Sequence, residues 1–159
     1  MRQRLLVVAR SPVDIVRMAG GWMVDQVFVG WEVMVLTEGR ADPAMRILGA
    51  RCHDLECALG SEESGRWPTA VAVDPDLYDS DERIRRVVNA ALESGVSDCR
   101  FWSDPAAPGE EDAAVRHRLS GAARAFKAQA LAALAVPAGP VEGTETFRPV
   151  ALLHPFGRI

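Results

Sequence analysis

Short apolar runs alternate with amphipathic segments along this chain, and the pattern is clearest in residues 4–37. Leu5–Val8 and Val33–Leu36 are continuous apolar runs, which is typical of strands buried on both faces of a sheet. Between them, apolar side chains recur at helical spacing and cover one wide arc: Ile15, Val16, Ala19, Trp22, Met23 and Val27. The order of strand, helix and strand predicts the opening unit of a parallel sheet.

Start and stop signals bound the helix inside this unit. Ser11 can cap its first turn, Pro12 suits the first helical position, and Asp14 stands where the acid of a capping box belongs. Gly30 follows the last apolar residue, as a left-handed terminal glycine commonly does. We therefore predict a helix between these residues that buries its arc against the sheet.

The alternation continues through the rest of the chain. Further elements are expected as a short helix from Asp42 to Gly49, strands at Ala50–Leu55, Thr69–Val73 and Asp98–Trp102, a helix with Asp79 and Glu82 as its capping box, and a long helix from about Asp112 to Ala135. The first of the two later helices carries Ile84, Val87, Val88, Ala91 and Leu92 on one face, and the long helix carries Val115, Leu119, Ala122, Phe126 and Ala133 on one stripe.

These elements predict an α/β fold, a Rossmann-like three-layer sandwich with a mostly parallel sheet of about five strands. A chain of 159 residues suits one such domain. We assign residues 1–136 to it, and residues 137–159 to a C-terminal connector that contains proline and glycine and adds a possible last strand at Val150–Leu153.

Composition and charge limit the kinds of partner and the cellular compartment that we expect for this protein. The formal net charge of -4 argues against a nucleic-acid partner, because such proteins normally present a basic face. No apolar run reaches the length of a membrane span, and the N-terminus does not have the features of a signal peptide. Cys52, Cys57 and Cys99 match neither a zinc site nor a disulfide framework, so we expect reduced thiols and a cytoplasmic protein.

Polar residues follow the predicted strands at the edge where an open parallel sheet binds ligands. The candidate ligand-binding residues are Arg10, Ser11 and Asp14 after the first strand, Glu38 after the second, and Asp74 and Asp76 after the fourth. Asp54 and Glu56 follow the third strand at the same edge. The alternative is that these residues are ordinary turn and cap residues. Pooled carboxylates at one edge could instead bind a hard cation or share a proton.

Cofactor motifs are absent from the sequence. The turn after the first strand is ARSP, without the G-x-G-x-x-G of a dinucleotide site, and there is neither a P-loop nor a G-x-S-x-G elbow. His53, His117 and His154 are scattered, so no ligand set for zinc is apparent. We therefore predict no cofactor and no metal. The amino end of the first helix, with Arg10 and Ser11, remains a candidate site for a small anion.

The N-terminal motifs resemble the start of the PIG-L (LmbE-like) de-N-acetylases, zinc enzymes that remove acetyl groups from N-acetylglucosaminyl substrates. In that family the first strand ends in Ala-His-Pro-Asp-Asp-Glu, a helix with Gly-Gly follows, and then comes Gly-His-x-Val-x-Val. This chain has ARSPVDI, then Ala19, Gly20 and Gly21, and then GWEVMVLTEG. The resemblance covers about the first 40 residues.

This chain differs from the family motif at the positions that bind the metal and supply the catalytic base. The resemblance puts Ser11 at the position of a metal-binding histidine and Val13 at that of the catalytic-base aspartate, which leaves Asp14 alone at a ligand position. The family's later His-Pro-Asp-His segment has no clear counterpart, because residues 79–83 are DSDER. Zinc would thus have no nitrogen ligand from this motif, and its water no base. The resemblance implies a degenerate catalytic centre.

Two functional hypotheses follow. The first is a non-catalytic Rossmann-like binding protein that takes a protein partner or a small anionic ligand. The alternative is an unrecognised hydrolase or transferase that uses the acidic edge of the sheet. A homodimer is also expected, because surplus apolar side chains lie off the inner stripes at Phe28, Trp31, Leu131 and Leu134. A monomer whose C-terminal tail covers these residues is the other possibility.

Overall fold

The computed structural model describes residues 2–60, 67–95, 97–103, 114–137 and 139–150. Its strands are β1 (Arg4–Val8), β2 (Glu32–Thr37), β3 (Arg51–Asp54), β4 (Ala70–Val73), β5 (Asp98–Trp102), β6 (Val115–Arg118) and β7 (Thr144–Pro149). Its helices are α1 (Pro12–Phe28), α2 (Asp42–Leu48), α3 (Leu55–Leu59), α4 (Pro75–Ser80), α5 (Glu82–Glu93) and α6 (Gly121–Ala133).

The strands form one sheet in the order β3-β2-β1-β4-β5-β7-β6. The first five strands in this order are parallel to one another, whereas β7 runs antiparallel to both of its neighbours. The predicted Rossmann-like α/β sandwich is confirmed. The sheet has seven strands rather than about five, because the segment before α6 and the C-terminal segment each add a strand.

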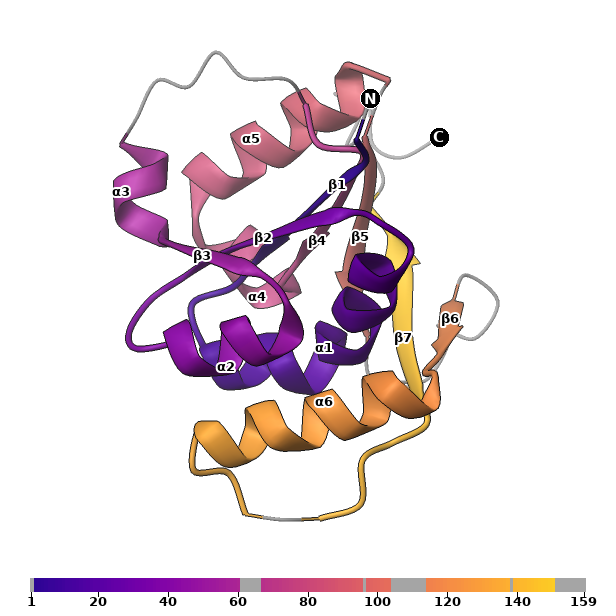
Figure 1. The fold of residues 1–159 in the computed structure, drawn as a ribbon. Coiled ribbons are helices and arrows are strands. Elements are labelled where there is room, and N and C mark those ends of the chain that lie inside the picture. Colours follow the sequence, from indigo (N-terminus) through magenta and orange to yellow (C-terminus); the bar gives the residue numbers. More distant parts are fainter. Residues whose placement is uncertain (1, 61–66, 96, 104–113, 138, 151–159) are drawn as a thin grey trace.

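Helices cover both faces of the sheet (Figure 1). One core cluster joins the sheet to α1, α2 and α6, and includes Ile15, Met23, Met45 and Phe147. A second cluster joins the opposite face to α3, α4 and α5. The central strands β1 and β4 are therefore packed against helices on both faces, as their continuous apolar sequences predict.

The predicted ends of α1 are confirmed. The Ser11 side chain accepts a hydrogen bond from the Asp14 amide, and Pro12 occupies the first turn. Gly30 has a φ of 98°, in the left-handed region that suits glycine. Trp22, 5% exposed, lies in the core as its position on the apolar arc predicts.

The long helix predicted from about Asp112 to Ala135 is wrong in its first part. Residues 115–118 pair with β7 as strand β6, and α6 begins only after Ser120, whose side chain accepts from the Ala123 amide. The inward face of α6 is made by Ala123, Lys127 and Ala130, while Phe126 of the predicted stripe is exposed. The apolar pattern predicted the wrong inward face for α6, because one of the buried residues on the true inward face is a lysine.

Other elements also differ from expectation. The helix α5 is capped by Asp81, whose side chain accepts from the Arg83 amide, and not by Asp79, which lies in the unpredicted helix α4. A second unpredicted helix, α3, follows β3 at Leu55. In the predicted connector, β7 lies at Thr144–Pro149, and the Val150 amide donates to the Cys99 carbonyl. Residues 151–153 of the predicted last strand, and most of the loop after β5, lie outside the described residues.

Candidate functional site

The strand order reverses between β1 and β4, because β2 and β3 lie on one side of this pair and β5 on the other. Ligands of open α/β sheets bind at such a switch point, outside the carboxyl ends of the strands. Arg10 and Ser11 follow β1, and Asp74 follows β4 directly. The topology thus brings together candidate residues that are far apart in the sequence.

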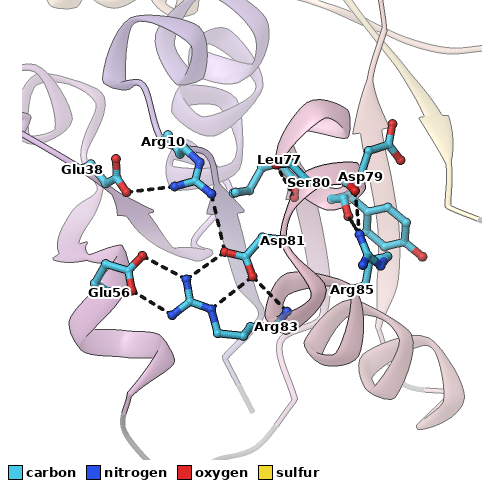
Figure 2. Close-up of polar contacts among 10 residues, drawn as sticks. Arg10, Glu38, Glu56, Leu77, Asp79, Ser80, Asp81, Arg83 and Arg85 are labelled. Atoms are coloured by element: carbon cyan, nitrogen blue, oxygen red, sulfur yellow. Dashed lines mark hydrogen bonds and ion pairs between the residues drawn. The ribbon is translucent and has the colours of Figure 1, made fainter.

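Arg10 belongs to a chain of ion pairs at this edge (Figure 2). Its Nη1 atom is 3.3 Å from Oε1 of Glu38, and its Nη2 atom is 3.6 Å from Oδ2 of Asp81. The side chain of Asp81 is only 8% exposed, whereas those of Arg10 and Glu38 are about half exposed. The Arg10 guanidinium is thus paired with two carboxylates from different loops.

Arg83 extends the chain of ion pairs on the other side of Asp81. Its guanidinium holds Glu56 through two bonds of 2.8 and 3.0 Å, and it donates to Asp81 Oδ2 at 2.8 Å. The hydrogen bonds from Arg83 lower the pKa of Asp81 to about 2 from its ordinary 3.8, and they also lower the pKa of Glu56. We call the residues Glu38, Arg10, Asp81, Arg83 and Glu56 the edge network.

The remaining predicted site residues serve as helix caps or lie beside them. Ser11 caps α1, and Asp74 caps α4 by accepting from the Asp76 amide at 3.0 Å. Burial raises the pKa of Asp74, the hydrogen bond from the Asp76 amide opposes this, and the negative charges of Asp76 and Asp14 add to the increase against a smaller opposing effect of Arg10. Asp74 is therefore a partly buried carboxyl group in a negatively charged setting.

Sequence reasoning found part of this site. Arg10 and Glu38 are in contact as their strand-end positions predict, and Glu56 was among the acids after the third strand. Asp81 and Arg83 were missed, because they lie in the DSDER segment that was assigned to a turn and a helix start. The signal that could have identified these two residues is an acid placed two residues before an arginine at the N-terminus of a helix.

The described residues contain no group of three or more His, Cys, Asp or Glu side chains placed to hold a metal ion. Asp14 is the one position of the zinc motif that retains its acidic residue, and it lies beside the Ser11 cap. The residues present at this edge thus do not fit the zinc site of the family that the N-terminal motif resembles. Among the described helices, none is both long and apolar enough to cross a membrane.

We predict that Arg83→Gln lowers stability in a manner that depends on pH. The pKa of Asp81 is lower in the folded chain than its ordinary value, so the Arg83 contact stabilises the fold above about pH 4, and this contribution is lost as the pH falls through about 2. Urea unfolding should show a less stable variant at pH 7 and a difference that shrinks towards pH 2. Arg86→Gln is the matched control, because within the described residues Arg86 pairs with exposed Glu82 alone. Equal stability of the two variants at pH 7 would contradict the role of the network.

Comparison with protein-family models gave no match, and comparison with curated protein sequences gave none either. Comparison with solved structures did. A triple mutant of a deacetylase of the teicoplanin biosynthetic pathway matches with a TM-score of 0.65 and 14% identity, over 92% of this chain and 97% of that one. The A40926 pseudoaglycone deacetylase Dbv21 matches with a TM-score of 0.62 and 16% identity, over 94% and 97%.

A conserved protein of Thermus thermophilus matches over the full length of both chains, with a TM-score of 0.55 and 17% identity. Identities this low show a shared fold. The likeness extends over nearly the whole chain, well beyond the first residues that carry the sequence motif. The chain therefore has the fold of these deacetylases, as the PIG-L (LmbE-like) resemblance indicated.

Proposed function

We propose that this chain is a non-catalytic binding protein built on the deacetylase-like fold. The observation that carries the proposal is the edge network: at the carboxyl edge of the sheet, arginine and carboxylate side chains bind one another. Ser11 and Asp74, which flank the switch point, are used as helix caps. These contacts favour a structural and recognition role for the edge over turnover.

A protein partner is favoured over the small anionic ligand. An anion at Arg10 would compete with the carboxylates of Glu38 and Asp81, and it would face the charges of Asp14, Asp74 and Asp76 nearby. The half-exposed side chains of the network can instead exchange ion pairs with a protein surface. The free thiols of Cys52, Cys57 and Cys99 suit a reducing compartment, so the proposal includes a cytoplasmic location.

Metal titration tests the proposal. We expect calorimetric titration of the purified chain with zinc to show no one-to-one site that depends on Asp14, because Ser11 and Val13 replace a ligand and the base of the family motif. The wild-type chain and Asp14→Ala should give the same isotherm. Stoichiometric zinc binding that disappears in Asp14→Ala would overturn the proposal.

A hydrolase or transferase is the second candidate, and the raised pKa of Asp74 favours it. A carboxyl group whose pKa lies nearer neutrality is better suited to transfer a proton. This candidate predicts a turnover activity that Asp74→Asn abolishes and that Asp54→Asn, a change in another helix cap, preserves. The binding proposal predicts that neither variant has an activity to lose.

We also propose a homodimer, in an interface that differs in part from the sequence prediction. Leu131 and Leu134 pack against the core, whereas Phe28 is 60% exposed, Val29 is 69% exposed and Phe126 is 37% exposed. The rings of Phe28 and Phe126 lie 6.1 Å apart, so the C-terminal end of α1 and the middle of α6 share one apolar patch.

Light scattering at micromolar concentration should give a dimer mass for the wild-type chain and a monomer mass for Phe28→Glu. Val87→Glu is the control, because Val87 is similarly exposed but lies on α5, at the opposite face of the sheet. A monomer mass for the wild-type chain at all concentrations would contradict the dimer.

A further inference from the structure

Among the described residues, strand β6 forms one edge of the sheet, with β7 as its one neighbouring strand (Figure 1). The amide of Leu119, just after β6, donates to the Gly143 carbonyl. Because bonded and non-bonded pairs alternate in an antiparallel ladder, the backbone groups of residues 115, 117 and 119 face β7. The N–H and C=O groups of Arg116 and Arg118 therefore point away from β7, along an edge that no other described strand covers.

The side chains of the same two residues are also available. His117 points towards α1, where its Nε2 atom lies 2.7 Å from Asp25 Oδ2, so Arg116 and Arg118 lie on the other face of β6. Both are exposed. In the part of the chain that the structure describes, neither guanidinium has an ion pair, although acidic residues outnumber basic ones in the sequence.

The strand is held in place before any partner arrives. Asp25 on α1 accepts from the Ser120 amide at 3.2 Å and from the Ser120 hydroxyl at 2.5 Å, in addition to its contact with His117. These bonds fix the end of β6 against α1. A preformed edge costs little conformational entropy when another strand is added to it.

Charge decides which strand this edge accepts. Charged side chains on an edge strand discourage pairing between copies, because a second β6 would bring like charges side by side. The same two arginines attract a strand that carries acidic side chains on the matching face. The opposite edge strand, β3, carries both signs of charge, in Arg51 and Asp54, and has no such preference.

We propose that β6 binds an extended acidic segment of a partner protein by adding it as a further strand of the sheet. Backbone groups of Arg116 and Arg118 supply the hydrogen bonds, and their guanidinium groups pair with carboxylates on alternate residues of the segment. This inference rests on the proposed function, since it names the kind of partner that a non-catalytic binding protein of this fold would take.

The test uses the full chain and three synthetic peptides of eight residues. One alternates valine with glutamate, the second has lysine in place of glutamate, and the third is the glutamate peptide methylated on alternate backbone nitrogens. Fluorescence anisotropy should show saturable binding of the first peptide only. Arg116→Glu/Arg118→Glu should weaken it about tenfold or more, because each change replaces an attractive exposed ion pair by a contact between like charges. Arg51→Glu on β3 should leave it unchanged.

Hydrogen exchange identifies the contact itself. The glutamate peptide should slow exchange of the Arg116 and Arg118 amides and leave the amides of β3 unaffected. The proposal would be overturned by equal binding of the glutamate and lysine peptides, by binding of the methylated peptide, by absence of binding, or by protection elsewhere than β6. These outcomes are independent of zinc binding, so this inference and the proposed function can fail separately.

Discussion

Replacing Lys127 with methionine should lower the free energy of unfolding by about 3–5 kcal/mol, a large part of the stability of a domain of this size. Lys127 and Glu145 form a buried ion pair of 2.8 Å, with side chains 5% and 1% exposed. Removing the ammonium group leaves the carboxylate of Glu145 buried without its counter-charge. The loss should appear as a lower midpoint in urea unfolding.

The ion pair also completes hydrogen bonds of α1. The carboxylate of Glu145 accepts from the amides of Gly21 and Trp22 at 2.8 and 2.6 Å, and Lys127 Nζ donates to the Arg17 carbonyl at 2.6 Å. Arg17 lies four residues before Gly21, so the ion pair contacts the carbonyl and the amide that regular helix geometry places opposite each other. It thereby joins α6 and β7 to the middle of α1.

The effect of Lys127→Met should depend on pH. Burial already raises the pKa of Glu145 above its ordinary 4.5, against the opposing charge of Lys127, and removal of that charge raises it further. A carboxyl group whose pKa is raised in the folded chain binds its proton more tightly there than in the unfolded chain. The stability of the variant should therefore increase relative to wild type as the pH is lowered from 7 towards 4.5.

Arg124→Met is the control for Lys127→Met. Arg124 lies one turn earlier on α6, is exposed, and has no ion pair within the described ranges. Its replacement should change stability by no more than about 0.5 kcal/mol. A loss for Lys127→Met as small as that of the control would show that the buried pair does not support the fold.

Gly21→Ala should destabilise the chain, whereas Gly20→Ala should not. A Cβ atom on Gly21 would overlap Cγ and Cδ2 of Leu119, which is buried against α1. A Cβ atom on Gly20 would meet its nearest neighbour, Val16 Cγ1, at 3.3 Å, so only a small shift is needed. Overpacking of a core costs about 1–3 kcal/mol, while alanine in a helix gains up to about 1 kcal/mol over glycine.

Thermal unfolding of the two variants separates packing from helix propensity, because both changes are made in the same helix. We expect a clear fall in the melting temperature for Gly21→Ala and a change near zero or a rise for Gly20→Ala. Leu119→Ala removes the side-chain atoms that a Cβ on Gly21 would overlap. Gly21→Ala should therefore lower the melting temperature less in a Leu119→Ala chain than it does in the wild-type chain. Equal effects of the two glycine substitutions would contradict the close approach of α1 to Leu119.

Local signals in the sequence were enough for the central elements of the fold. The apolar runs of β1, β2 and β4, the ends of α1, and the start of α2 at Asp42 and its terminal Gly49 lie where the sequence predicts them. The segments that were misassigned depend on distant contacts. β6 is a strand because it pairs with β7, and the inward face of α6 includes a lysine whose partner, Glu145, is 18 residues away.

The site shows the same division. The strand-end positions of Arg10 and Glu38 follow from the order of strands, and these two side chains do meet. The role of Asp81 depends on an unpredicted helix, α4, which brings this carboxylate back to Arg10 from beyond the end of β4. The hydrophobic pattern of the sequence does not indicate that the chain turns back towards Arg10 after α4. The exposed edge of β6 was also missed, because residues 115–118 were predicted to be part of a helix and not a strand.

Our proposal depends above all on the carboxyl edge of this deacetylase-like fold not catalysing the reaction that the family motif serves. The most direct measurement is acetate release from N-acetylglucosamine by the purified chain in the presence of equimolar zinc, with Asp14→Ala measured in parallel. We expect both proteins to release acetate no faster than buffer with zinc alone. Zinc-dependent acetate release by the wild-type chain, lost in Asp14→Ala, would contradict the proposal.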